Sequence, residues 1–259
     1  MILEKIIDKR KKQLEHEIKQ ISRAKMYKLA SENTRPIINF YDALRNDSLS
    51  VISEVKKASP SKSVIRHDFK PIEIAKEYEQ SGANAISCLT EEFYFQGSSI
   101  YLSDIRKNVS IPILRKDFIF DEYQIYEARV IGADAILLIA SILDTQTLIR
   151  FKELAESLGL QCLFEVHNDE ELESVLQARP NIVGINNRNL KTFEVSLDIT
   201  KMLAKEIPKH CIIVSESGIA DNEDMKRVKE YGVDAVLIGE TLMRSENIAE
   251  TMRQLRNGI

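Results

Sequence analysis

The chain has 259 residues, of which 44% are hydrophobic and 29% charged, with nine Gly and six Pro. This composition is typical of a globular protein and excludes a disordered or collagen-like chain. The longest unbroken apolar run, Ala135 to Ala140, is far shorter than the roughly 20 residues of a membrane span, so we expect no membrane contact. The charged first residues have no secretory apolar core, which predicts a cytoplasmic protein.

The net charge of −4 is unevenly distributed. Residues 1–50 hold eleven Lys and Arg against seven Asp and Glu, or +4, which leaves −8 for the rest. Basic runs such as Lys9 to Lys12 are typical of a solvated helix face. A nucleic-acid-binding domain is basic as a whole or has aromatic residues among its basic ones, so we expect no nucleic-acid partner.

Residues 1–48 are predicted to be helical. Apolar residues recur there at helical spacing, at Leu3, Ile7, Leu14, Ile18 and Ile21. A second short apolar segment covers residues 37–44. Because so short a segment cannot bury a core of its own, we expect residues 1–48 to pack on the rest of the chain as a helical extension. Residues 1–259 are therefore predicted to form a single domain.

Short apolar, β-branched runs follow, each with the length of a buried strand. They are Val51–Val55, Ala85–Leu89, Ile111–Leu114, Ala135–Ile139, Gln161–Val166, Ile182–Ile185, Cys211–Val214 and Ala235–Ile238. Helical patterns lie between them, and several begin after a polar residue, such as Asp121, Asp144 and Asp169. Regular alternation of strand and helix predicts a parallel sheet covered by helices.

An internal repeat favours a closed barrel over an open sheet. Gly82, Gly132 and Gly232 each follow a helical pattern and precede an apolar run, as a helix C-cap does. Their separations are multiples of about 25 residues, and repeated strand–helix units of that length fit a (β/α)8 barrel. The competing doubly wound sheet has no support, because the chain contains no G-x-G fingerprint. We therefore predict an α/β fold, a (β/α)8 TIM barrel with an N-terminal helical extension.

Polar side chains gather at the carboxyl ends of five of these strands, where parallel strands are otherwise apolar. They are Glu54, Lys56, Lys116, Glu165, Asn186, Arg188, Glu216 and Ser217, the last of which precedes Gly218. Each alone is explained by a salt bridge or a loop cap at the barrel rim. Together they favour a site in which amines and carboxylates have displaced pKa values, as acid–base chemistry near neutral pH requires.

Glycines follow the last two predicted strands, in ESGI and LIGET. Backbone N–H groups beside Gly218 and Gly239 can approach an anion closely, and barrels often bind phosphate at this position. Ser and Gly are also ordinary turn residues, so the pattern predicts a phosphate site only in combination with a barrel.

These motifs resemble those of a known enzyme family. The resemblance rests on SEVKKASPSKS, LTEEFYFQGS, ILRKDFIFDEYQIYEAR, LFEVH, GINNRNL, SESGI and LIGETLM, which occur in order between about residue 37 and the C-terminus. Together they closely resemble indole-3-glycerol phosphate synthase, a (β/α)8 barrel of tryptophan biosynthesis. The resemblance implies a carboxy-lyase that closes 1-(2-carboxyphenylamino)-1-deoxyribulose 5-phosphate to an indole, with loss of carbon dioxide and water. It implies a small phosphorylated substrate and no cofactor, and we expect a monomer.

The resemblance also implies catalytic roles. Lys116 is similar to the general acid that protonates the substrate ketone oxygen while the aromatic ring attacks that carbon. Glu165 is similar to the base of the later dehydration, with a lysine as the acid. Glu54, Lys56 and Asn186 are implied to form the network around them.

Substrate contacts are implied by the same resemblance. Phe95, Phe118 and Leu137 line the pocket of the aromatic ring, and Arg188 and Glu216 contact the sugar portion or order its neighbours. Ser59 orders the first loop, and Lys56 brings positive charge to the carboxylate or phosphate of the substrate. The phosphate is held by Ser217, Gly218, Gly239 and the N–H of Glu240.

Two positions need separate mention. Glu240 stands where some members of the family have Ser, and its carboxylate would repel a phosphate unless the side chain turns outward. His167 would share the strand face of Glu165, but a lone histidine is more typical of a hydrogen-bonded loop residue than of a catalyst. Neither an HExxH motif nor closely spaced cysteines are present, so we expect no metal.

Two alternatives stay open. Phosphoribosylanthranilate isomerase is another phosphate-binding barrel, but its Cys and Asp pair would have to end strands one and four, and strand one offers Glu54 and Lys56 instead. A barrel that binds a phosphorylated ligand without catalysis is the other, against which Lys116 and Glu165 argue. If the extension lies over the barrel mouth, its +4 charge could steer an anionic substrate; otherwise the charge is solvated surface.

Overall fold

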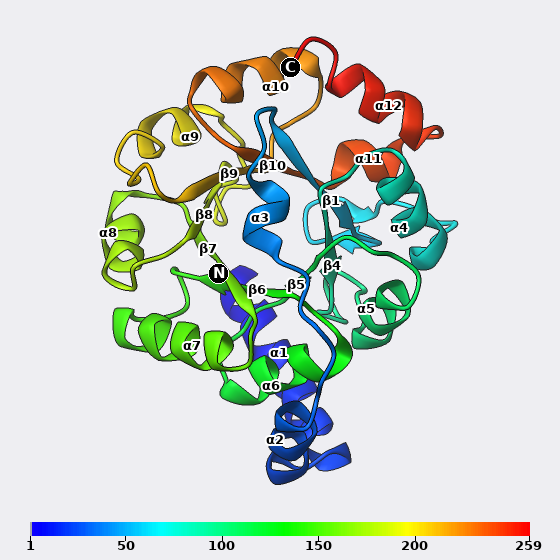
Figure 1. The fold of residues 1–259 in the computed structure, drawn as a ribbon, viewed down its shortest axis with the longest axis vertical. Coiled ribbons are helices and arrows are strands. Elements are labelled where there is room, and N and C mark those ends of the chain that lie inside the picture. The colour runs from blue at the N-terminus through cyan, green and yellow to red at the C-terminus, as the bar shows by residue number, and fades with distance from the viewer. Residues whose placement is uncertain (1) are drawn as a thin grey trace.

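Eight parallel strands close into a barrel in the computed structural model, which describes residues 2–259 (Figure 1). The strands are β1 (Ser50–Val55), β4 (Ala85–Leu89), β5 (Ile113–Lys116), β6 (Ala135–Ile139), β7 (Gln161–Val166), β8 (Ile182–Asn186), β9 (Ile212–Glu216) and β10 (Ala235–Ile238). They pair in the order β1-β10-β9-β8-β7-β6-β5-β4, and β4 returns to β1. An antiparallel hairpin of β2 (Ala58–Ser59) and β3 (Ser63–Val64) lies in the loop after β1. The predicted (β/α)8 barrel is confirmed.

Helices surround the barrel and connect its strands (Figure 1). They are α4 (Pro71–Gln80), α5 (Ser99–Arg106), α6 (Glu122–Ile131), α7 (Thr145–Ser157), α8 (Asp169–Gln177), α9 (Asp198–Leu203), α10 (Asn222–Glu230), α11 (Glu240–Arg244) and α12 (Ile248–Leu255). Asp121 and Asp144 cap α6 and α7 as predicted, whereas Asn168 rather than Asp169 caps α8. None of the helices in the described chain is both long and apolar enough to cross a membrane.

Several strands differ from their predicted bounds. The predicted strand at residues 111–114 begins at Ile113, because Pro112 has no N–H to give to the sheet. At the carboxyl ends β5, β8 and β9 extend further than the apolar runs, so Lys116, Asn186 and Glu216 are the last residues of their strands. Their backbones are therefore fixed by sheet pairing, and their side chains start from a rigid base.

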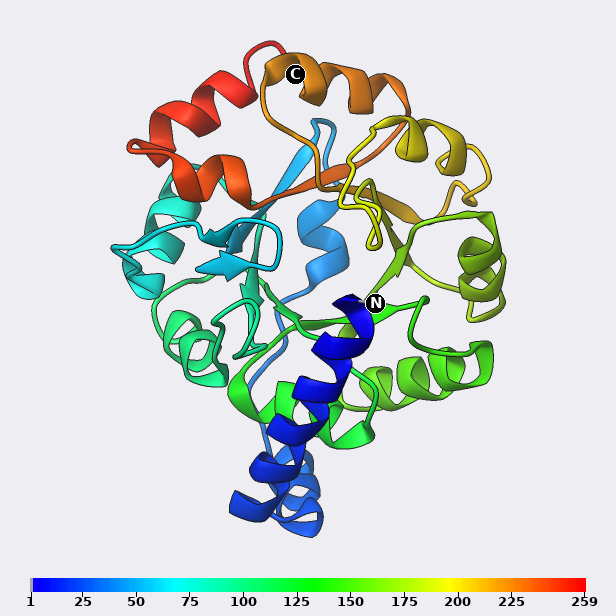
Figure 2. The same ribbon diagram turned by 180° about the vertical axis from the view of Figure 1, so that it is seen from behind.

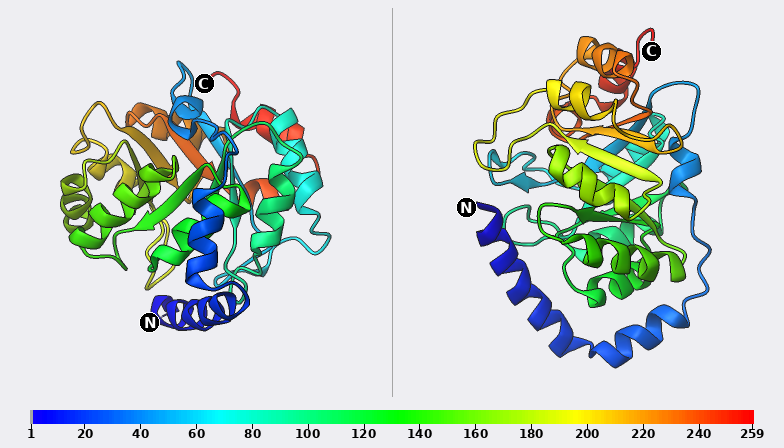
Figure 3. Two further views of the ribbon diagram at one scale, coloured as in Figure 1. Left: turned by 60° about the horizontal axis from the view of Figure 1, so that its bottom comes forward. Right: turned by 90° about the vertical axis from the view of Figure 1, so that its left-hand side faces the viewer.

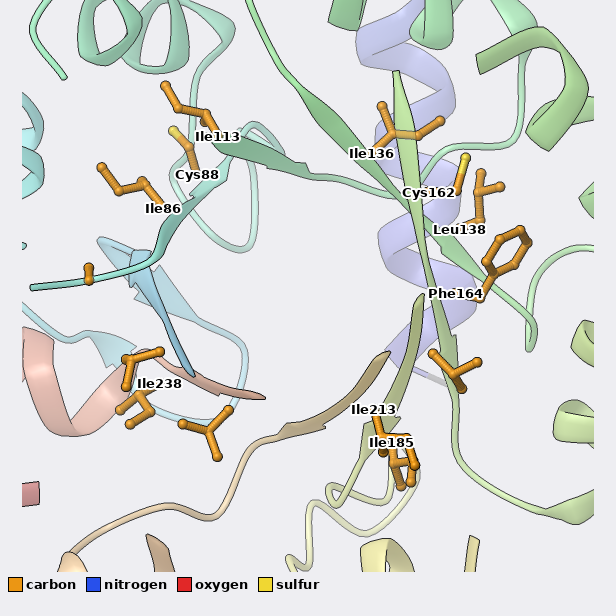
Figure 4. Packing of buried hydrophobic residues seen from close by; sticks show 14 of the residues in the cluster. Ile86, Cys88, Ile113, Ile136, Leu138, Cys162, Phe164, Ile185, Ile213 and Ile238 are labelled. Carbon is orange, nitrogen blue, oxygen red and sulfur yellow. The ribbon is translucent and has the colours of Figure 1, made fainter. Parts of the chain in front are cut away.

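Side chains alternate between two cores along each strand. Ile136 and Leu138 of β6 and Cys162 and Phe164 of β7 belong to the larger core, which also contains buried residues of the surrounding helices (Figure 4). The inward core includes Leu137 of β6 and at least one apolar residue from each of the other seven strands of the barrel. At the carboxyl ends of β5 and β7 this alternation turns Lys116 and Glu165 inward, which gives the barrel an apolar floor and a charged mouth.

The segment before β1 forms three helices, α1 (Ile2–Gln20), α2 (Arg23–Ser31) and α3 (Phe40–Leu44). Phe40 and Leu44 of α3 join the inward core and close one end of the barrel. Helix α1 lies across the opposite end (Figures 2 and 3). Helix α2, which lies between α1 and α3 in sequence, packs against α6. The ring centroids of Tyr27 and Tyr126 are 5.2 Å apart there.

The basic run near the start of α1 contains one buried residue. Lys9, Lys11 and Lys12 are exposed as predicted, but Arg10 is 0% exposed, so the prediction of a solvated face is wrong for this residue. Its Nε donates to Asp117 Oδ1 at 2.9 Å. Arg10 faces β5 rather than solvent, and helical spacing alone cannot show which partner an inward charge meets.

Asp117 is the centre of a buried polar network. Besides Arg10, it accepts a hydrogen bond from Thr90 Oγ1 at 2.8 Å and one from Arg115 Nη2 at 3.0 Å. Arg115 also contacts Glu127 of α6 at 2.6 Å. Burial favours the neutral acid, but the two guanidinium groups lower the pKa of Asp117. The network ties α1 to the strand that ends in Lys116.

We expect Arg10→Met to lower the free energy of unfolding by about 3 kcal/mol, because it leaves the buried carboxylate of Asp117 without one of its two cations. Lys11→Met removes an exposed charge from the same helix turn and should change stability by no more than about 0.5 kcal/mol. Urea unfolding of the three proteins measures both values. Equal losses for the two variants would contradict a structural role for the Arg10 pair.

Candidate active site

A cavity of about 630 Å³ lies at the carboxyl ends of the barrel strands. Every residue that the sequence predicts for catalysis, substrate binding or phosphate binding lines this cavity. Glu54, Lys116, Glu165 and Glu216 come from inward positions of β1, β5, β7 and β9. Lys56 and Arg188 follow β1 and β8, and the two glycines follow β9 and β10. The barrel thus brings together residues as far apart in sequence as Glu54 and Glu240, a separation of 186 positions.

Lys116 lies between two buried carboxylates. Its Nζ is 3.1 Å from Glu165 Oε2 and also contacts Glu216 Oε2. Burial alone would lower the pKa of this amine, but the charges of Glu216 and Glu165 raise it above the ordinary lysine value. Lys116 is therefore a charged ammonium, which can both polarise and protonate an oxygen placed beside it.

The two carboxylates around Lys116 differ in their protonation. Burial raises the pKa of Glu216 to about 7, even though Lys116 opposes that shift. Burial also acts on Glu165, but there the charges of Lys116 and His167 prevail and lower its pKa. Glu165 is thus an ionised base, whereas Glu216 exchanges its proton near neutral pH.

Glu216 fits into the barrel because its neighbour on β8 is a glycine. A Cβ atom at Gly184 would lie 2.1 Å from Glu216 Oε1, far inside contact distance. That same oxygen is buried and has no hydrogen-bond partner among the described residues. The side chain therefore has one oxygen in contact with Lys116 and one oxygen packed against Gly184.

A second cation, Lys56, lies at the end of β1. Its Nζ is in direct contact with Glu54 Oε1. Gly239 lies against this pair, since a Cβ atom there would be 2.3 Å from Glu54 Oε1 and 2.8 Å from Lys56 Nζ. The absence of a side chain at residue 239 thus lets the ammonium of Lys56 approach the predicted phosphate loop.

Asn186 links the two sides of the site. Its Nδ2 donates to Glu165 Oε1 at 3.2 Å. Its Oδ1 accepts from the backbone N–H of Arg188 and from Ser217 Oγ, both at 3.0 Å. These contacts fix the orientation of the amide, and through it they hold the carboxylate of Glu165 and the turn at Ser217 in one arrangement.

The apolar part of the cavity includes residues that the sequence did not predict. Phe95 and Phe118 lie with ring centroids 6.0 Å apart, and Leu137 lines the same cavity. Among the residues missed are Ile2, Leu3 and Ile6 of α1. Their apolar spacing was visible in the sequence, but nothing there shows that the helix crosses the barrel mouth.

The chain matches, over residues 3–255, the protein family described as "Indole-3-glycerol phosphate synthase". It belongs to the indole-3-glycerol phosphate synthase family. Proteins of this name from Alkaliphilus metalliredigens and Acetivibrio thermocellus are each 50% identical to it. The matches cover 100% and 99% of this chain, respectively, and 99% of each relative. The family and the enzymatic function predicted from the sequence are confirmed, which disfavours both alternatives.

Solved structures share the fold at low sequence identity. The 3-hexulose-6-phosphate synthase of Salmonella typhimurium matches with a TM-score of 0.66 and 14% identity, over 81% of this chain and 97% of its own. KGPDC from Streptococcus mutans matches with a TM-score of 0.63 and 14% identity, over 82% and 97%. At such identity the likeness shows the barrel fold alone.

Glu240 is the position at which this chain departs from some members of the synthase family. Its carboxylate lies 2.9 Å from Arg244 Nε and 3.8 Å from Lys62 Nζ. Two cations thus offset the charge that would otherwise repel a phosphate. Arg244 also lines the cavity and was missed by sequence reasoning.

His167 has a partner on each side of its ring. Nδ1 lies 3.0 Å from Glu171 Oε2, as expected of a hydrogen-bonded loop residue, but Nε2 faces Glu165 Oε1 at 3.4 Å.

Among residues 2–259 there is no group of three or more His, Cys, Asp or Glu side chains placed to hold a metal ion.

We expect Glu216→Gln to stabilise the protein at high pH relative to low pH. The folded-state pKa of about 7 lies above the ordinary value of 4.5, so ionising Glu216 in the folded protein costs stability above neutral pH and costs nothing in acid. The stability of the variant relative to wild type should therefore rise by roughly 1 to 3 kcal/mol between about pH 5 and about pH 8. Denaturant unfolding at both pH values, with the exposed substitution Glu230→Gln as control, measures this difference. A difference that stays constant or falls would refute the raised pKa.

Proposed function

We propose that this cavity closes 1-(2-carboxyphenylamino)-1-deoxyribulose 5-phosphate to indole-3-glycerol phosphate, with Lys116 as the acid of ring closure. The observation that carries the proposal is the position of the Lys116 ammonium. It lies between Glu165 and Glu216, in one cavity with the aromatic pocket and the glycine loops. The family named for this reaction includes the chain over almost its whole length.

The substrate has an aromatic end and a phosphate end, and the cavity has a matching region for each. Phe95, Phe118 and Leu137 give the benzene ring an apolar surface. The phosphate would be held by backbone N–H groups at Gly218 and Gly239, with Lys56 as a cation, and Arg188 would contact the sugar portion. Ser217 and the N–H of Glu240 complete this end, and Ser59 lies in the hairpin beside it.

Ring closure joins an aromatic carbon of the substrate to its ketone carbon. Lys116 Nζ–H gives its proton to the ketone oxygen while the new carbon–carbon bond forms, so no free alkoxide develops. The attack interrupts the aromaticity of the ring. Loss of the ring carboxylate as carbon dioxide returns an electron pair to the ring and restores it.

Dehydration completes the indole. Glu165 takes a proton from the ring-closed intermediate while a lysine ammonium protonates the leaving hydroxyl group, which departs as water. Lys56, held against Glu54, is the second ammonium of the cavity and can serve as this acid. Since the carboxylate substrate loses carbon dioxide and water, each turnover takes up one proton from outside the substrate.

We expect the wild-type protein, without added metal or nucleotide, to convert this substrate to a product with indole absorbance and fluorescence. Lys116→Ala should lower kcat by about 100-fold or more, because the ketone loses its proton donor, while substrate affinity stays nearly unchanged. Lys107→Ala, which removes an exposed lysine, is the matched control.

Steady-state fluorescence assays and equilibrium binding of the substrate by Lys116→Ala separate the two effects. A kcat near the wild-type value in Lys116→Ala would refute the acid assignment. Wild-type protein that binds the substrate but forms no indole would instead support the non-catalytic alternative.

A further inference from the structure

We propose that Asn187 is a positioning residue for phosphate binding, which holds the turn at Ser217 and Gly218 so that its N–H groups face the cavity. The inference rests on the proposed function, because this turn is the proposed site of the substrate phosphate. Asn186 and Arg188 line the cavity, whereas Asn187, within the described chain, does not. Asn187 therefore acts through the turn rather than on the substrate.

The turn needs support because its backbone conformation is strained. Ser217 has a φ of 65° and Gly218 a φ of 91°, so both residues lie in the left-handed region. A residue with a Cβ atom rarely adopts this conformation, and the strain persists only where surrounding contacts impose it. The conformation of Ser217 therefore depends on the groups that its backbone meets.

The side-chain amide of Asn187 meets that backbone directly. Its Nδ2 donates to the carbonyl oxygens of Glu216 and Ser217, both at 3.1 Å. Its backbone N–H also donates to the carbonyl oxygen of Glu216, at 2.9 Å. Asn187 thus holds the two consecutive carbonyl groups that lead into the left-handed turn.

These contacts determine where the N–H groups of the turn point. In a trans peptide the C=O and N–H groups point in opposite directions. The carbonyl oxygens of Glu216 and Ser217 face Asn187, on the outer side of the barrel wall. The N–H groups of the same two peptides, which belong to Ser217 and Gly218, are therefore directed to the cavity side, where an anion can accept them.

The orientation of the amide is fixed by its other contacts. Oδ1 accepts the backbone N–H of Thr200 at 3.1 Å and its hydroxyl at 2.8 Å. Since a backbone N–H can only donate, Oδ1 must face α9 and Nδ2 must face the turn. Nδ2 also donates to Ser215 Oγ at 2.9 Å. Asn187, Thr200 and Ser215 are all buried, so these hydrogen bonds are costly to lose.

Asn187 also fixes the loop that packs on the turn. Its carbonyl oxygen accepts the backbone N–H of Ser196 at 3.1 Å. In the same loop Val195 pairs with Arg188 and lies against the turn, since a Cβ atom at Gly218 would be 2.8 Å from Val195 Cγ1. One buried residue thus connects the turn, this loop and helix α9.

We expect Asn187→Ala to weaken the binding of phosphate in particular. The dissociation constant of inorganic phosphate should rise at least about tenfold, whereas that of 2-aminobenzoate, which represents the aromatic end of the substrate, should change less than about twofold. Titrations followed by backbone-amide NMR measure both constants without turnover. In steady-state assays KM should rise at least about tenfold and kcat change less than about threefold, because the lost contacts are common to substrate and transition state.

Thr200→Val is the matched control, because it acts on the other side of the same amide. It removes the hydroxyl contact with Oδ1 and leaves the donors that hold the turn. Both variants lose buried hydrogen bonds and should unfold at lower urea concentration than wild type, but only Asn187→Ala should lose phosphate affinity. Equal losses of phosphate affinity in the two variants would overturn the proposal in favour of a general structural role. Equal losses for phosphate and 2-aminobenzoate in Asn187→Ala would overturn it as well.

Asn187→Asp covers the case in which Asn187→Ala fails to fold. It keeps the size of the side chain and the acceptor for Thr200, but an ionised carboxylate cannot donate to the turn. Phosphate affinity should fall at least about tenfold, and the loss should persist at about 0.5 M salt, which screens simple charge repulsion. Wild-type affinity, or a loss that salt abolishes, would overturn the proposal. Wild-type protein that forms no indole would instead overturn the proposed function, since the binding measurements need no turnover.

Discussion

The buried ammonium of Lys116 is the group on which the arrangement of the barrel mouth depends. A buried charge is strongly unfavourable unless opposite charges and hydrogen bonds surround it. Glu165 and Glu216 provide those charges from β7 and β9, and Gly184 of β8 leaves the space that Glu216 needs. Because all of these residues belong to parallel strands of the barrel, sheet pairing holds the proposed acid and base in register before any substrate arrives.

The opposite face of β5 carries a second set of charges that supports the first. Arg115 and Asp117 flank Lys116 in sequence and point into the network that Arg10 of α1 completes. Helix α1 also places its first apolar residues against the cavity. The extension is thus part of the site wall rather than an appendage, and its position depends on the strand that carries the acid. Most of its +4 charge lies on exposed lysines, as the solvated-surface interpretation expects.

The sequence was sufficient for the barrel and for the predicted residues of the cavity, and the reason is periodicity. Alternation along a strand determines which side chains point inward, so Glu165 and Glu216 could be assigned to the mouth before their strand ends were known. Contacts between elements had no such signal. Arg10 sits in a run of lysines that resembles solvated surface, and the Glu171 partner of His167 follows from the turn into α8 rather than from any motif. The predicted strands ended too early where polar residues, such as Asn186, continue the sheet pairing beyond the apolar run.

The protonation of Lys116 is the central claim, because ring closure and the difference between the two carboxylates both require an ammonium there. Titration of lysine side chains by heteronuclear NMR, with the Lys116 signal assigned by its loss in Lys116→Ala, measures this directly. The account predicts that Lys116 stays charged to a pH above the ordinary lysine pKa of about 10.4. A Lys116 signal that titrates at or below about pH 8 would contradict it, because the amine would then lack the proton it must donate.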